Sequence, residues 1–172
     1  MNAAYVVIEF SHPDKLIPAV EKLESCSTVE SWDAVEGHAE HADLVARVRI
    51  ANGRLPEELR QLDGLKQTTV LEIVDGEEFP PALESLPIRA YVFIDTDPEQ
   101  KEAVRSAILA LPDAISCSRM ADTCDLVALI KGETLSQLKR TIKDRIQTLD
   151  GVLRLKPRYA FNIKQLQGQP NE

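Results

Sequence analysis

The chain has 172 residues, of which 44% are hydrophobic and 28% charged, so it is long enough to bury one core or two small ones. Its formal net charge of -8 argues against unspecific binding to nucleic acid or anionic membranes, because such binding needs clustered Lys and Arg. No apolar run approaches the roughly 20 residues of a membrane-spanning helix, and the N-terminal residues lack the pattern of a secretory signal, so we expect a cytoplasmic protein.

The first half of the chain predicts six elements from the spacing of its apolar residues. In chain order they are a strand at 4–10, a helix at 16–23, a hairpin of strands at 28–35 and 43–50, a short helix at 55–62 and a strand at 67–74. The second half predicts the same order. Its elements are a strand at 90–96, a helix that runs to 111 with Asp97 as its N-cap and Pro98 at its first position, a hairpin of strands at 114–121 and 125–132, a helix at 135–149 and a strand at 153–161.

Three short phrases of the first half return in the second half, in the same order and at similar offsets. The pairs are Ala4–Ile8 with Ala90–Ile94, Asp43–Ala46 with Asp125–Ala128, and Leu62–Leu65 with Leu149–Val152. In both halves a glycine directly follows the second helix, as expected for the left-handed residue that ends a helix. The chain is therefore predicted to contain two tandem copies of one unit.

A unit with the order strand–helix–strand–strand–helix–strand is ferredoxin-like, with two helices on one face of a four-stranded antiparallel sheet. We predict an α+β protein with a first unit at 1–75, a linker at 76–88, a second unit at 89–163 and a disordered tail at 164–172. Because each unit leaves one sheet face bare, we expect the two copies to bury these faces in a pseudo-dimeric α/β barrel.

The second copy carries a more specific pattern, in which Leu111–Ala114 ends the first helix, Asp125-Leu126 follows a turn and Leu149–Val152 ends the second helix. In these phrases it resembles the effector-binding domain of the Lrp/AsnC (feast/famine) transcription regulators, an ACT-like dimeric α/β-barrel module. The first copy resembles that domain more loosely. Family regulators also carry a winged helix-turn-helix, and we expect none here because the first strand begins near residue 4.

The resemblance implies that an amino-acid-like effector binds at the turn between the second and third strands of each copy. In the second copy this turn is Asp122, Thr123, Cys124 and Asp125, and in the first copy it runs from Glu40 to Asp43. The two aspartates that begin the third strands have two interpretations. Each carboxylate either faces a ligand or accepts hydrogen bonds from backbone N–H groups of the turn.

His38 and His41 lie close together beside acidic residues in the hairpin turn of the first copy. A pair of histidines with this spacing can bind zinc or another divalent ion, but on an exposed turn the same side chains are usually solvated. We therefore predict no metal and no cofactor.

Cys124 is a candidate nucleophile only if a neighbouring base or positive charge lowers the pKa of its thiol. The second copy contains no histidine, so we expect an inert, half-buried side chain. The three cysteines, Cys26, Cys117 and Cys124, are an odd number without zinc-like spacing, which predicts reduced thiols.

The sequence contains no catalytic triad, phosphate-binding loop or dinucleotide fingerprint. Our first interpretation is a non-catalytic, stand-alone sensing or regulatory module that associates with itself or with a partner protein and does not bind DNA or membranes directly. One alternative is an enzyme of the dimeric α/β-barrel type, such as a cofactor-free oxygenase or an isomerase-like protein. Another is a structural interaction subunit without a ligand.

Overall fold

The computed structural model describes residues 2–36, 42–75, 88–121 and 124–161. The chain divides into two compact units, Met1–Glu72 with Ala160–Glu172, and Ile73–Tyr159. The predicted linker and the predicted C-terminal tail fall almost entirely outside the described residues.

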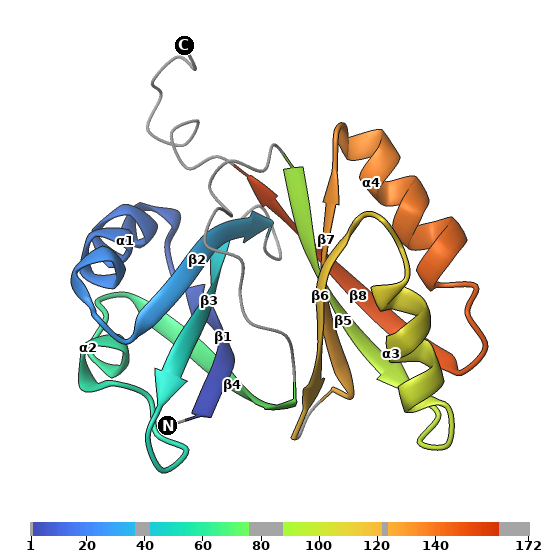
Figure 1. Ribbon diagram of the computed structural model, residues 1–172. Helices are drawn as coiled ribbons and strands as arrows, with labels where there is room; N and C mark the ends of the chain where they lie inside the picture. Colours follow the sequence, from blue (N-terminus) through green and yellow to red (C-terminus); the bar gives the residue numbers. More distant parts are fainter. Residues whose placement is uncertain (1, 37–41, 76–87, 122–123, 162–172) are drawn as a thin grey trace. The chain divides into compact units, whose positions relative to one another are not determined.

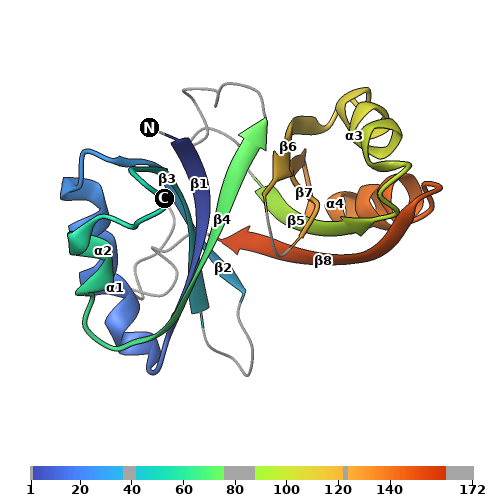
Figure 2. The same ribbon diagram turned by 90° about the horizontal axis from the view of Figure 1, so that it is seen from below.

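The first unit follows the predicted order of elements. These are β1 (Asn2–Phe10), α1 (Leu16–Ser25), β2 (Val29–Glu36), β3 (Ala42–Ile50), α2 (Glu57–Arg60) and β4 (Leu65–Asp75), with the 3-10 helix η1 (Pro13–Lys15) before α1. The strands pair antiparallel in the order β4-β1-β3-β2. Both helices lie on one face of this sheet (Figures 1 and 2). Ala160, which belongs to this unit, pairs with Val35 of β2.

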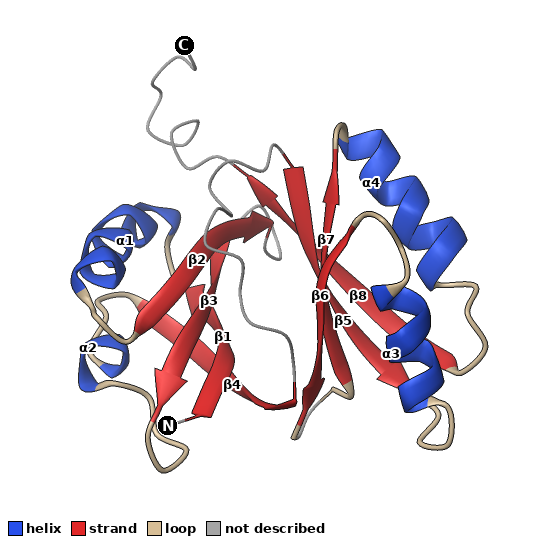
Figure 3. Ribbon diagram, in the orientation of Figure 1, coloured by secondary structure: helices blue, strands red, loops and turns tan. Residues whose placement is uncertain are grey.

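The second unit repeats this topology with a longer second helix. Its elements are β5 (Ile88–Thr96), α3 (Lys101–Leu109), β6 (Ala114–Met120), β7 (Leu126–Gly132), α4 (Leu135–Thr141), the π-helix η3 (Ile142–Ile146) and β8 (Val152–Phe161). The strands pair antiparallel in the order β8-β5-β7-β6, and α3 and α4 lie on one face (Figure 3). This arrangement confirms the predicted α+β class and the tandem ferredoxin-like units.

Equivalent backbone hydrogen bonds hold corresponding parts of the two units. The N–H of Ser11, after β1, donates to the carbonyl of Gly64 at 2.9 Å, and the N–H of Asp97, after β5, donates to that of Gly151 at 2.8 Å. Both glycines have positive φ, +75° and +96°, which side chains with a Cβ rarely adopt. The glycine after each second helix therefore turns the chain so that its carbonyl reaches the end of the first strand.

Each unit has its own hydrophobic core between the sheet and the helices. On β1 and β5 the residues that face the helices alternate with residues on the other sheet face, as the period of two in a strand requires. The four-residue α2 contributes Leu59 to the first core, and α4 contributes Leu138 to the second. Burial of one leucine contributes roughly 1.5–3 kcal/mol, so even the short α2 is anchored by its apolar side chain.

Candidate functional site

The turn predicted to bind the effector in the second unit lies between β6 and β7. Asp122 and Thr123 fall outside the described residues, whereas Cys124 and Asp125 are described. The N–H of Asp125 donates to the carbonyl of Ile94 at 3.0 Å, and its own carbonyl accepts the N–H of Met120 at 3.0 Å. The backbone of Asp125 therefore connects the ends of β5 and β6.

The carboxylate of Asp125 is held by two further contacts. Its Oδ2 accepts the N–H of Thr96 at 2.8 Å, and its Oδ1 forms an ion pair of 3.1 Å with Lys101 Nζ. Partial burial raises the pKa of Asp125, but the Thr96 N–H and the Lys101 ammonium outweigh it and hold the pKa below its ordinary value of 3.8. An ionised Asp125 thus joins the turn to the end of β5 and the start of α3.

Cys124 lies beside Asp125 and is half-buried. Burial, followed by the negative charges of Asp95 and Asp125, raises the pKa of its thiol to about 12. A thiol in this environment stays protonated near neutral pH, so Cys124 lacks the thiolate that a nucleophile needs.

In the first unit Glu40, His38 and His41 fall outside the described residues, so the candidate metal pair cannot be placed. Asp43 is described and lies at the start of β3, opposite Val35, with only 3% of its surface exposed. The described part of the chain contains no group of three or more His, Cys, Asp or Glu side chains that could hold a metal ion.

The two units differ in the ion pair that closes the loop after their first strand. In the first unit Lys15 pairs with Asp63 at 2.9 Å, whereas Lys101 pairs with Asp125. Asp63 belongs to the turn after α2, and Asp125 belongs to the predicted effector turn. A lysine therefore reaches the predicted turn in the second unit and is engaged elsewhere in the first.

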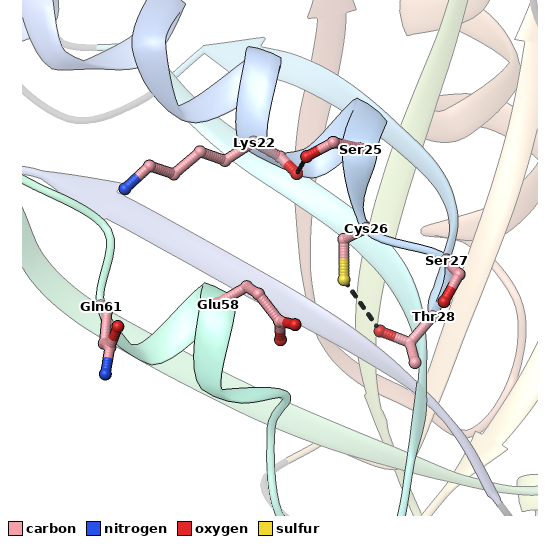
Figure 4. A pocket seen from close by; sticks show the side chains of 7 residues that line it. All are labelled: Lys22, Ser25, Cys26, Ser27, Thr28, Glu58 and Gln61. Carbon is pink, nitrogen blue, oxygen red and sulfur yellow. Dashed lines mark hydrogen bonds between the residues drawn. The ribbon is translucent and has the colours of Figure 1, made fainter.

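The first unit contains a pocket of about 400 Å³ that sequence reasoning missed (Figure 4). It lies between the end of α1 with the turn that follows and the short α2. Its lining residues are Lys22, Ser25, Cys26, Ser27, Thr28, Glu58 and Gln61. The signal available in the sequence was the polar triplet Cys26-Ser27-Thr28, which stands where the second copy has Leu111-Pro112-Asp113.

None of the helices in the described residues is both long and apolar enough to cross a membrane.

Residues 89–163 match the family model of the Lrp/AsnC ligand binding domain. This match confirms the resemblance predicted for the second copy. No curated protein matches the chain in sequence.

Solved structures extend the comparison. The siroheme decarboxylase NirDL is 12% identical, with coverage of 92% of this chain and 71% of that one and a TM-score of 0.68, so the two share a fold across both units. The protein TTHA0845 from Thermus thermophilus is 29% identical over 44% of this chain and 94% of its own, with a TM-score of 0.42. The transcriptional regulator NMB0573 from Neisseria meningitidis, solved as a complex with L-Met, is 12% identical over 50% of this chain and 57% of its own, also with a TM-score of 0.42.

Proposed function

Because residues 89–163 match the Lrp/AsnC ligand binding domain, we propose that this protein is a sensing or regulatory module for a small, amino-acid-like effector. The effector binds at the turn between β6 and β7, around residues 122–125, with a second candidate turn between Glu40 and Asp43. Binding alters how the protein associates with itself or with a partner protein. The match of the second unit to a ligand-binding family is the observation that carries this proposal.

The contacts of Asp125 support this choice of turn. Its carboxylate is already occupied by the Thr96 N–H and by Lys101, so Asp125 acts as a positioning residue and the effector contacts the neighbouring turn. Because Asp125 is held before binding, this end of the turn loses less conformational entropy when the ligand arrives, which favours affinity.

Thermal-shift measurements with amino acids, nucleotides and divalent metals test the proposal, because a ligand that binds only the folded state raises Tm. We expect at least one amino acid to raise Tm, and we expect the shift to shrink in Asp125→Ala when each variant is compared with its own ligand-free Tm. Asp144→Ala is the matched control, since Asp144 is an exposed acidic residue of the same unit that lies on η3, outside the turn. A shift of full size in Asp125→Ala contradicts the proposed site.

An enzyme of the same fold is the alternative, and the likeness to siroheme decarboxylase NirDL over 92% of the chain favours it at the level of fold. The two proposals differ in their ligand. Saturable binding of an iron tetrapyrrole, measured by a shift of its visible absorption band, together with its decarboxylation, would support the enzyme. Stabilisation by amino acids without any such spectral change supports the sensor, and no response to either class supports a subunit that acts through protein contacts alone.

A further inference from the structure

The pocket of the first unit exists because this unit departs from the second at two places. Cys26 follows α1 and donates its N–H to the carbonyl of Leu23, as Leu111 does after α3 with the carbonyl of Ile108. Leu111 packs against the second core, whereas Cys26 lines the pocket. The second helix is also reduced to the four residues of α2, where the second unit has seven residues of α-helix and five of π-helix.

Two opposite charges line this pocket without pairing. Lys22 comes from α1 and Glu58 from α2, and Figure 4 shows the Lys22 ammonium on the side of Gln61 and the Glu58 carboxylate nearer to Cys26. Among the described residues neither side chain forms an ion pair, although the charge of Lys22 acts at longer range on Asp63, which is itself paired with Lys15. A ligand that carries both charges would compensate both side chains at once.

The remaining lining is polar and partly fixed. Gln61 Nε2 donates to Glu57 Oε1 at 2.9 Å, which leaves the amide oxygen of Gln61 as an acceptor on the Lys22 side of the pocket (Figure 4). On the opposite side Cys26 Sγ lies 3.1 Å from Thr28 Oγ1 (Figure 4). The Glu58 carboxylate suits an ammonium group, whereas the Lys22 ammonium suits a carboxylate.

From this distribution of charge we propose that the first unit binds a small zwitterion of the amino-acid class in the pocket between α1 and α2. The volume of about 400 Å³ is in the range of small-molecule sites. Because Lys22 and Glu58 are both exposed, we expect weak binding, with a Kd on the order of 1 mM. This site shares no residue with the turn at Asp125, so the two proposals stand or fall separately.

Cys26 provides a reporter inside the pocket. Cys117 is fully buried and the Cys124 thiol stays protonated, so iodoacetamide should modify Cys26 first in the folded protein. The rate of this modification, followed by mass spectrometry, is measured with glycine, β-alanine, γ-aminobutyrate and 6-aminohexanoate. This series increases the separation of the two charges and so finds the spacing that the pocket accepts. Acetate, methylamine and glycerol are the matched half-charged and neutral probes.

We expect at least one zwitterion to slow modification of Cys26 saturably, and acetate, methylamine and glycerol to be about tenfold weaker or more. Lys22→Met and Glu58→Gln should each weaken the protection about tenfold. Arg60→Met and Glu24→Gln, which change exposed residues of the same two helices outside the pocket, should not. NMR shifts of the Ser27 and Thr28 amides give a second readout that does not depend on the thiol.

Three results would overturn the inference. These are an absence of both protection and amide shifts with every zwitterion, equal protection by glycerol or acetate, and protection that survives Lys22→Met and Glu58→Gln. The variant Asp125→Ala distinguishes the zwitterion site from the effector turn. It should leave the protection of Cys26 unchanged. Conversely, Lys22→Met should leave the amino-acid-induced thermal shift of the second unit unchanged.

Discussion

Replacement of Asp125 by alanine should destabilise the second unit more than replacement of an exposed acidic residue of the same unit. The variant removes the acceptor of the Thr96 N–H, and Thr96 is only 3% exposed, so water replaces that acceptor poorly. A buried N–H without an acceptor costs about 1–3 kcal/mol. The Lys101 pair, with side chains 29% and 31% exposed, adds about 0.5 kcal/mol. We therefore expect a loss of about 1.5–3.5 kcal/mol in the free energy of unfolding.

Asp125→Asn separates the two contributions. The amide oxygen can still accept the Thr96 N–H while the negative charge opposite Lys101 is lost, so a smaller loss of about 1 kcal/mol is expected. Urea unfolding followed by circular dichroism gives the free energies, and hydrogen exchange of the Thr96 N–H reports the local contact. The reasoning is refuted if Asp125→Ala costs no more than Asp144→Ala, or if exchange at Thr96 is unchanged.

The same contacts predict a pH dependence. Because the folded protein holds the pKa of Asp125 below its ordinary value, the charged form is favoured by folding. The stabilisation is fully present above the unfolded pKa of about 3.9 and is lost as the pH falls through the lower folded pKa. The stability difference between the wild type and Asp125→Asn should therefore stay constant from neutral pH to about pH 5 and shrink below about pH 4.

Three further predictions concern other positions. Gly151→Ala should lower the free energy of unfolding, measured in urea, by about 2 kcal/mol or more, because a Cβ at φ +96° would meet the Gln100 side chain. Gly53→Ala should lower it by only about 1 kcal/mol, because Gly53 has φ +70° but faces open space. Equal losses would contradict the packing argument. Thr134→Ala should cost about 1 kcal/mol, since the Thr134 side chain accepts the N–H at the third position of α4 at 3.1 Å, and Thr134→Ser should restore most of the loss. Iodoacetamide near pH 8 should modify Cys26 well before Cys124, whose thiolate fraction there is about 1 in 10,000, and comparable rates would contradict the protonated thiol.

Local patterns in the sequence were sufficient to predict the elements, because their signals lie within a few residues of one another. The apolar residues of β1 and β5 face one core at alternate positions, and the short second helix of the first unit follows from three leucines. Helix starts were less predictable. Asp97 accepts the N–H of Glu99 at 3.0 Å as a cap would, but a turn intervenes and α3 begins only at Lys101.

The role of the candidate turn was harder to predict from the sequence, because its contacts come from distant parts of the chain. The pattern Asp-Leu-Val-Ala identified Asp125 as a residue of interest and left open whether its carboxylate binds a ligand or caps the backbone. The partners that hold it, Thr96 and Lys101, lie 29 and 24 positions earlier. In the first unit the corresponding lysine, Lys15, pairs with Asp63 instead, and nothing in either phrase indicates this exchange.

The sequence by itself determined the order of the elements, the two ferredoxin-like units and the resemblance of the second copy to the Lrp/AsnC domain, since all three follow from the spacing of apolar residues and from short phrases. Tertiary structure alone decided which charges meet. It joined Asp125 to Thr96 and Lys101, kept the Cys124 thiol protonated, and placed Lys22 and Glu58 around one pocket without pairing them. Pairing and pKa values depend on distance and burial in three dimensions, which residues far apart in the chain acquire only after folding.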